Sequence, residues 1–184
     1  MKKDPVHSLR LLSALLHYPD RDMLGEIEMI ETELDAMASQ EMKVCMNEFL
    51  RYFKSRSLID LQEGYTAVFD MNHSTTLNLT YHIYGDNEKR ADMLARLQQS
   101  YQDAGYESTT GELPDYLPMM LEFISVCPDT EDTRLIWECF RGIDGYVDRL
   151  QKTAPPYAAL LRPLIPMVAD RVETGERPLA SGQL

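Results

Sequence analysis

Several features that mark common protein classes are scarce in this 184-residue chain. Its three cysteines, Cys45, Cys127 and Cys139, are an odd number without C-x-x-C spacing, which indicates neither a disulfide framework nor a zinc site. No apolar stretch approaches the ~20 residues that a membrane span needs, and the first residues lack the apolar core of a signal peptide. We therefore expect a cytoplasmic protein with reduced thiols and no direct membrane insertion.

The chain also lacks the familiar signatures of catalysis. It contains no G-x-S-x-G, no phosphate-binding glycine loop, no H-E-x-x-H and no G-x-G-x-x-G. Its four histidines are too far apart in the sequence to share the face of a helix as metal ligands: His7, His17, His73 and His82. We therefore expect no enzyme activity, no catalytic residue, no metal site and no cofactor.

Positive charge is scarce as well. The sequence has 18 basic and 30 acidic residues, which gives a formal net charge of -12. A nucleic-acid backbone is held by clustered Lys and Arg, whereas the basic residues here are scattered, so nucleic acid is not expected as a partner. The negative field favours partners with basic segments, although acidity also serves solubility alone.

Apolar residues recur at helical spacing along most of the chain, and capping residues stand where helices should begin. Asp20 or Asp22 is placed to cap a second helix and Ser39 a third. Ser57 and Asp60 form a weak capping box for a fourth helix. The pattern is that of amphipathic helices packed into a globule, not of a coiled coil.

The middle of the chain is less regular. The run 75–84 is rich in Thr, Leu and Tyr, but no second strand is available to pair with it, so we expect a short helix or an irregular segment. Asp86 should cap a long helix that Gly105 ends, and another helix should cover residues 116–127.

The C-terminal third is predicted as two long helices. Residues 135–150 follow one helical face despite Gly142 and Gly145, and the last helix, from residue 155, should be kinked or shortened by its internal prolines. These patterns predict an all-α fold: one globular bundle of about eight to ten helices over residues 1–173, with a disordered tail at residues 174–184.

The most distinctive segment is Glu112-Leu113-Pro114-Asp115-Tyr116-Leu117-Pro118. Pro114 cannot continue a preceding helix, and Asp115 can cap a new one, which places Pro118 in the first turn, where a missing N–H costs nothing. The segment therefore predicts a rigid hinge between two helices. Such a hinge is where an all-helical protein would present a surface to a partner.

Asp70 is a second candidate, because it falls at the end of the fourth helix, where a negative charge meets the unfavourable pole of the helix dipole. It is either a functional residue or a structural one that caps the next segment or pairs with an arginine such as Arg90. Tyr65 and Phe69, one turn apart, are either core residues or the wall of a groove.

Four motifs, in order, resemble those of the nitrate reductase assembly chaperones. They are Leu15-Leu16-His17-Tyr18-Pro19-Asp20, similar to LL-x-YPD; Tyr65-Thr66-Ala67-Val68-Phe69-Asp70, similar to Y-x-x-L-F-D; His82-Ile83-Tyr84-Gly85 with Arg90, similar to H-x-x-G-x(4)-R; and Glu112 to Pro118 with Glu122, similar to E-L-P-D-H-L-P-x-x-L-E. Order and spacing agree from about Leu9 to Phe123, and beyond that only helical character supports the resemblance.

The resemblance implies a NarJ-type molybdenum cofactor assembly chaperone with the all-helical TorD/DmsD fold. Such a protein binds the N-terminal segment of the apo catalytic subunit of a respiratory molybdoenzyme and supports cofactor insertion, without being a catalyst or a subunit of the final complex. For this chain the resemblance implies nitrate reductase as the client. Tyr116 stands where the family usually has histidine, so a side chain that titrates near neutral pH is missing there.

Three alternatives remain open at this point. The client is a selenate, chlorate or dimethyl sulfoxide reductase; the chain is an enzyme with His82, Asp70 and Arg90 in one cleft; or it is a permanent helical subunit. The favoured hypothesis is a monomer or weak dimer with a groove lined by Tyr65, Phe69, Leu113 and Tyr116. Its negative rim comprises Asp70, Glu112, Asp115 and Glu122. The other residues expected to bind the partner are His82, Arg90, Pro114 and Pro118.

Overall fold

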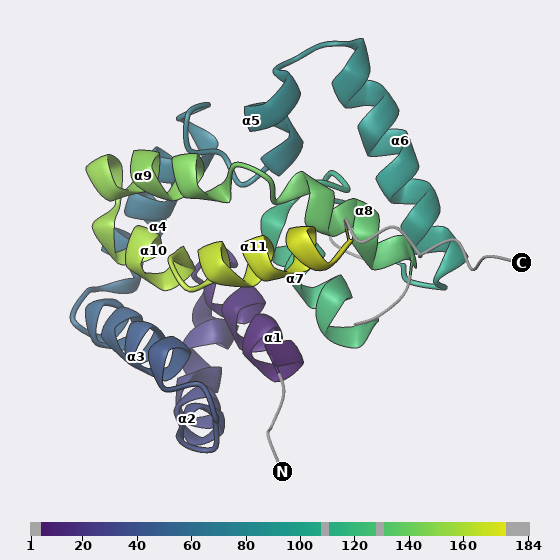
Figure 1. Ribbon diagram of the computed structural model, residues 1–184. Helices are drawn as coiled ribbons and strands as arrows, with labels where there is room; N and C mark the ends of the chain where they lie inside the picture. Colours follow the sequence, from purple (N-terminus) through teal and green to yellow (C-terminus); the bar gives the residue numbers. More distant parts are fainter. Residues whose placement is uncertain (1–4, 108–110, 128–130, 176–184) are drawn as a thin grey trace, which may run out of the picture.

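The computed structural model describes residues 5–107, 111–127 and 131–175, and within these ranges its regular elements are helices joined by turns and irregular segments, without a β-strand (Figure 1). This confirms the predicted all-α fold. The elements are α1 Pro5–Leu15, α2 Arg21–Asp35, α3 Gln40–Lys54, α4 Leu58–Tyr65, a π-helix Thr66–Asp70, α5 Leu79–Tyr84, α6 Glu88–Asp103, α7 Leu117–Val126, α8 Glu131–Cys139, α9 Ile143–Thr153, α10 Pro155–Leu161 and α11 Leu164–Gly175.

The predicted helix starts in the first half of the chain are largely confirmed by their caps. Asp20 accepts a hydrogen bond from the Met23 amide at the start of α2, and Ser39 does the same at the start of α3. Ser57 and Asp60 form a reciprocal capping box on α4. The long helix α6 begins one residue later than predicted, because Asn87 and not Asp86 caps it.

Helix α7 lies at the centre of the bundle. Only Glu122 and Val126 of its ten residues are not buried, which explains why its sequence is apolar on all sides. Helix α1 packs along it, and the Ser13 hydroxyl donates to the Pro118 carbonyl at 2.7 Å. The first turn of α7 is thereby anchored to α1, close to the end of that helix.

The C-terminal third differs from the prediction of one helix over residues 135–150. Gly142 adopts φ +87, a left-handed conformation that interrupts the helix, so α8 ends at Cys139 and α9 begins at Ile143. The helix from residue 155 is shortened as expected, since Pro163 lies between α10 and α11, whereas Pro166 lies within α11. The predicted tail begins at residue 174, but residues 174 and 175 belong to α11 and residues 176–184 lie outside the described ranges.

The segment that follows the π-helix is irregular and then forms the short helix α5, as predicted. Before α5 it pairs with the corner that precedes α7. Asn78 and Tyr116 form an isolated antiparallel bridge, in which the Leu117 amide donates to the Leu77 carbonyl at 2.8 Å and the Leu79 amide to the Asp115 carbonyl at 3.0 Å. Two segments far apart in the sequence are thus held side by side.

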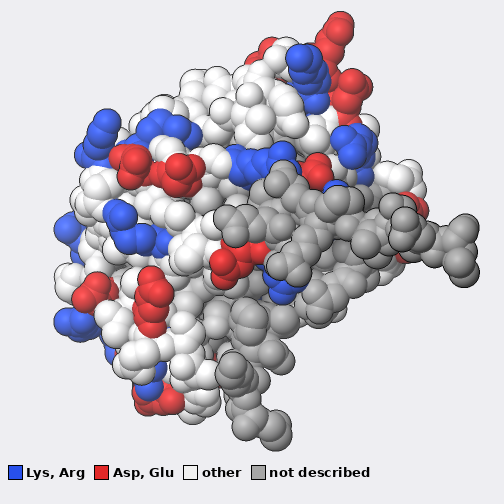
Figure 2. Space-filling view, viewed as in Figure 1, with Lys and Arg blue, Asp and Glu red and all other residues white. Residues whose placement is uncertain are grey.

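Charged side chains of both signs are interspersed on the face shown in Figure 2, in keeping with the scattered basic residues of the sequence. Among the helices that the structure describes, none combines the length and the apolar character required to cross a membrane.

Candidate partner-binding site

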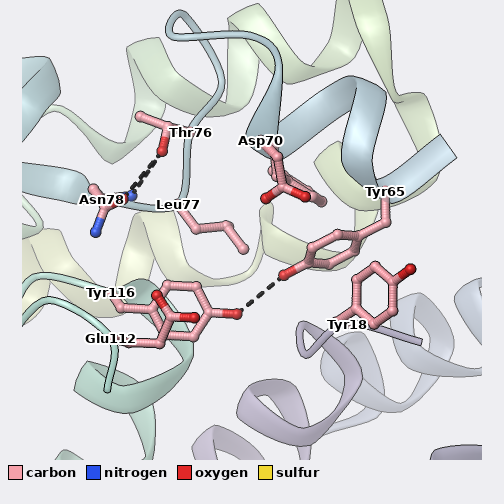
Figure 3. A pocket seen from close by; sticks show the side chains of 9 residues that line it. Tyr18, Tyr65, Asp70, Thr76, Leu77, Asn78, Glu112 and Tyr116 are labelled. Carbon is pink, nitrogen blue, oxygen red and sulfur yellow. Dashed lines mark hydrogen bonds between the residues drawn. The ribbon is translucent and has the colours of Figure 1, made fainter. Parts of the chain in front are cut away.

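A cavity of about 260 Å³ opens where the end of α1, the π-helix and the corner before α7 meet (Figure 3). Four of its lining residues are aromatic and two are carboxylates. We call it the tyrosine cavity; its lining residues are Tyr18, Tyr65, Phe69, Asp70, Thr76, Leu77, Asn78, Glu112 and Tyr116. Five of the residues predicted for the groove are therefore brought together here: Tyr65, Phe69, Asp70, Glu112 and Tyr116.

The π-helix forms one wall of the tyrosine cavity. Such wide turns are rare and often occur at functional sites. Here the Met71 amide donates to the Thr66 carbonyl at 2.9 Å, five residues back. Phe69 is buried against Tyr65 in an edge-to-face contact with the ring centroids 4.8 Å apart, while Asp70 stays exposed. The wall thus presents a packed aromatic pair and one carboxylate.

Two tyrosine hydroxyls meet across the tyrosine cavity. Those of Tyr65 and Tyr116 lie 3.0 Å apart, and Tyr65 also donates to the Leu16 carbonyl at 3.1 Å. A carbonyl can only accept a hydrogen bond, so the single O–H of Tyr65 points to Leu16. In the bond between the two tyrosines, Tyr116 must therefore be the donor. Burial raises the pKa of Tyr65 far above its ordinary value, so this chain of hydroxyls stays protonated.

Asp70 and Glu112 make the tyrosine cavity negative. Both carboxylates are exposed. Burial is the main cause that raises the pKa of the Tyr116 hydroxyl, and the negative charges of Glu112 and Asp70 raise it further. The possible pairing of Asp70 with Arg90 is not formed, because Arg90 is engaged elsewhere. Among the described residues, no hydrogen-bond or ion-pair partner is found for the side-chain carboxylate of Asp70.

The expectation that Asp115 caps α7 and stands on the negative rim is wrong. Tyr116 occupies the cap position, and Asp115 is 0% exposed. Its carboxylate accepts hydrogen bonds from Asn78 Nδ2 at 2.9 Å and Thr80 Oγ1 at 2.5 Å, and from Arg90 Nη2 at 3.4 Å. A buried carboxylate needs such partners, and here they fasten the corner to the segment that carries Leu77 and Asn78.

His82 and Arg90 do not face the tyrosine cavity. The Nε2–H of His82 donates to the Thr76 carbonyl at 2.8 Å, since that carbonyl can only accept, and burial lowers the pKa of the ring. His82 lines a separate cavity near α8 and α9, whereas Arg90 pairs with Asp115. His82, Asp70 and Arg90 therefore do not gather in one cleft, and the arrangement that would have favoured an enzyme is not formed.

The remaining predicted residues surround the tyrosine cavity without lining it. Leu113 is 46% exposed on the corner. The Pro114 carbonyl accepts a hydrogen bond from Tyr101, Pro118 is buried, and Glu122 accepts one from Tyr106 at 2.8 Å. Of the residues predicted to line the groove, Tyr65, Phe69 and Tyr116 line the tyrosine cavity, whereas Leu113 does not. Of the predicted rim, Asp70 and Glu112 are at the cavity, whereas Asp115 and Glu122 are not.

Sequence reasoning missed four lining residues: Tyr18, Thr76, Leu77 and Asn78. Tyr18 did carry a signal, because it is an aromatic residue between the end of a helix and a proline, in one of the quoted motifs. The other three follow from the bridge between Asn78 and Tyr116, which the sequence does not reveal.

No metal site stands out in the part of the chain that the structure describes, where no group of three or more His, Cys, Asp or Glu side chains is placed to share an ion. The cysteines are free thiols, with Cys139 buried and the other two half-buried. The lining of the tyrosine cavity offers carboxylate charge, hydrogen-bond acceptors and aromatic surface for recognition.

Comparisons with known proteins agree with this assignment of fold. Residues 33–161 match the family model described as nitrate reductase delta subunit. A Bacillus subtilis (strain 168) protein named "probable nitrate reductase molybdenum cofactor assembly chaperone NarJ" is 31% identical over 155 residues, 84% of each chain. The Escherichia coli (strain K12) nitrate reductase molybdenum cofactor assembly chaperone NarJ is 26% identical over 168 residues, 90% of this chain and 71% of that one.

A crystal structure from Archaeoglobus fulgidus, of a protein described as a redox enzyme maturation protein, has the same fold. It superposes with a TM-score of 0.65 at 20% identity and covers 92% of this chain and 96% of that one. The family model spans well over half of the chain, and its range includes both walls of the tyrosine cavity. The chain therefore belongs to the nitrate reductase delta subunit family, the family of the NarJ-type assembly chaperones.

Proposed function

We propose that this protein is an assembly chaperone for the catalytic subunit of a nitrate reductase. It binds the apo subunit through that subunit's N-terminal segment, supports insertion of the molybdenum cofactor, and is not itself a catalyst. The observation that carries the proposal is the similarity over 155 residues to a relative named as such a chaperone. The cytoplasmic location and the monomeric or weakly dimeric state belong to the same proposal.

The tyrosine cavity supports the peptide-binding part of this function. A segment of another protein that docks on a groove needs apolar walls for affinity and charges that set its orientation. The cavity offers both, because aromatic rings form its walls and Asp70 and Glu112 stand beside them. A client segment with an apolar face and basic residues would match this surface, and the net charge of -12 would speed its approach.

The chaperone role is tested by the metal content of the client. The reductase is expressed in cells with and without this chain, and molybdenum in the purified catalytic subunit is measured by mass spectrometry. We expect molybdenum to be largely missing without the chain and restored by the wild-type chain. Full molybdenum content in its absence would overturn the proposal. Co-purification of the chain with mature, cofactor-loaded enzyme would instead indicate a permanent subunit.

Peptide binding is tested separately by calorimetry with the N-terminal peptide of the same organism's catalytic subunit. The double variant Tyr116→Phe/Glu112→Gln keeps the shape of the tyrosine cavity while it removes one hydroxyl and one charge. We expect weaker binding to this variant than to wild type, with unchanged circular dichroism. Equal affinities would remove the cavity from the account of peptide binding, and matched peptides from selenate, chlorate or dimethyl sulfoxide reductases would report the choice of client.

A further inference from the structure

A second hollow, of about 410 Å³, borders the same α4–π-helix segment and shares Tyr18 with the tyrosine cavity. Its apolar residues Ile59 on α4, Ala67 in the π-helix and Met71 just after it are all exposed, Ile59 and Met71 to 66% and 79%. We call this hollow the apolar shelf; its lining residues are Tyr18, Ile59, Gln62, Glu63, Thr66, Ala67 and Met71. Exposed apolar side chains that gather in this way mark an interaction surface.

The tyrosine cavity differs from the apolar shelf in its hydrogen-bonding character. The Tyr65 hydroxyl donates a hydrogen bond to the Leu16 carbonyl, and the Tyr116 hydroxyl donates one to the Tyr65 hydroxyl. Thr76 donates to the side-chain oxygen of Asn78 at 3.2 Å, a bond drawn in Figure 3. The hydroxyls of Tyr65, Tyr116 and Thr76 therefore all donate their hydrogen bonds to other groups of the protein. The Tyr116 oxygen still has lone pairs that can accept a hydrogen bond from a ligand.

A guest in the tyrosine cavity thus meets acceptors and negative charge. In Figure 3 the Asp70 carboxylate points into the space above the Tyr65 ring, and Glu112 lies beside Tyr116 on the opposite wall. Side chains that only donate hydrogen bonds and carry positive charge are those of Lys and Arg. The aromatic rings add a favourable surface for such a cation.

We propose that the binding site has two compartments divided by Tyr18: the tyrosine cavity receives one Lys or Arg side chain of the client's N-terminal segment, and the apolar shelf receives an apolar side chain of the same segment. This inference rests on the proposed function and adds which side chains of the client each compartment recognises. Tyr18 is 44% exposed at the junction, where its ring contacts Tyr65 edge-to-face with centroids 5.4 Å apart.

Double-mutant cycles between the chain and the peptide test the two compartments. The probe is the N-terminal peptide of the catalytic subunit, with a series in which each Lys or Arg is replaced by Gln and each apolar residue by Ala, one at a time. Asp70→Asn should weaken the unaltered peptide by about tenfold, since a hydrogen bond to a charged group is worth roughly that factor. With one particular Lys→Gln or Arg→Gln peptide, the same variant should matter by less than about twofold.

Met71→Ser should behave in the opposite way. It should weaken the unaltered peptide and the Lys→Gln or Arg→Gln peptides by the same factor, and lose its effect only with one of the alanine peptides. Raised salt should reduce the Asp70 effect more than the Met71 effect, because charge interactions are screened by salt.

Matched control variants come from exposed residues on other helices. Asp92→Asn on α6 removes one negative charge, and Met29→Ser on α2 removes a methionine that is 54% exposed. Neither should change peptide affinity. If the effects of Asp70→Asn and Asp92→Asn are equal, the tyrosine cavity does not read a cation.

The outcomes separate this inference from the proposed function. If the peptide binds and Asp70→Asn is uncoupled from every basic residue of the peptide, the two-compartment rule is overturned while the chaperone proposal stands. If Met71→Ser leaves the affinity for the unaltered peptide unchanged, the apolar shelf is overturned. If the unaltered peptide does not bind the wild-type chain, both the rule and the peptide-binding part of the proposed function fail.

Discussion

Glu112 and Asp115 stand three residues apart on the same corner, yet their surroundings are opposite. Glu112 is exposed and lines the tyrosine cavity, whereas Asp115 is fully buried and accepts hydrogen bonds from Asn78, Thr80 and Arg90. The Glu112 carboxylate lies at the surface of the tyrosine cavity, and the Asp115 carboxylate holds the walls of the cavity together. Residues of one motif, only three positions apart, can therefore serve different ends, one at the binding surface and one in the framework.

The largest test of this division replaces each carboxylate by its amide. Asp115→Asn leaves Arg90 without its buried partner and should lower the free energy of unfolding by about 3–5 kcal/mol. Glu112→Gln, the matched variant at an exposed position, should change it by less than about 0.5 kcal/mol. Urea titration followed by circular dichroism measures both. Similar values for the two variants would show that Asp115 is not a framework residue.

A second, smaller test compares two tyrosines. The Tyr146 hydroxyl donates to the buried Thr75 carbonyl at 2.9 Å, so Tyr146→Phe should cost about 1–3 kcal/mol of stability and leave peptide affinity unchanged. Tyr116→Phe removes an oxygen that faces the tyrosine cavity and should lower peptide affinity with a smaller cost in stability. Urea titration and calorimetry on both variants separate the two effects. A loss of peptide affinity in Tyr146→Phe would show that Tyr146 acts on binding as well as on stability.

The smallest expected effect concerns pH. Burial lowers the pKa of His82 in the folded chain below the ordinary value of 6.5, so between these two values the unfolded state binds more protons. The contribution of His82 to the free energy of unfolding is therefore fully present above about pH 6.5 and is lost as the pH falls through the pKa of the folded state. We expect a smaller loss of unfolding free energy between pH 7.5 and 5.5 in His82→Gln than in wild type. An equal loss would show that the His82 ring is not held neutral by the fold.

Much of the first half of the fold is predictable from the sequence, because the signals there are local. Asp20, Ser39 and Ser57 cap the helices that their side-chain chemistry suggests. The break at Gly142 was missed because apolar spacing continues across it, and periodicity alone does not report a left-handed residue.

The candidate site is only partly predictable, for a different reason. Tyr65, Phe69 and Asp70 follow one another on a single helical segment, so their common location is a local property. The burial of Asp115 depends on residues 78–90 folding back beside the corner, which is a long-range contact with no local signal. Asp115 has the side chain of a helix cap, but it serves as a buried hydrogen-bond acceptor between the corner and residues 78–90.

We expect the surface around Tyr18 to receive the client's N-terminal segment. A photo-cross-linking residue placed at position 71, with position 29 as the matched exposed control, tests it when the chain is expressed together with the apo catalytic subunit. Mass spectrometry then maps the linked peptides. We predict cross-links from position 71 to the first residues of the subunit and none from position 29. Cross-links from position 71 only to other parts of the subunit, or none at all, would contradict the account.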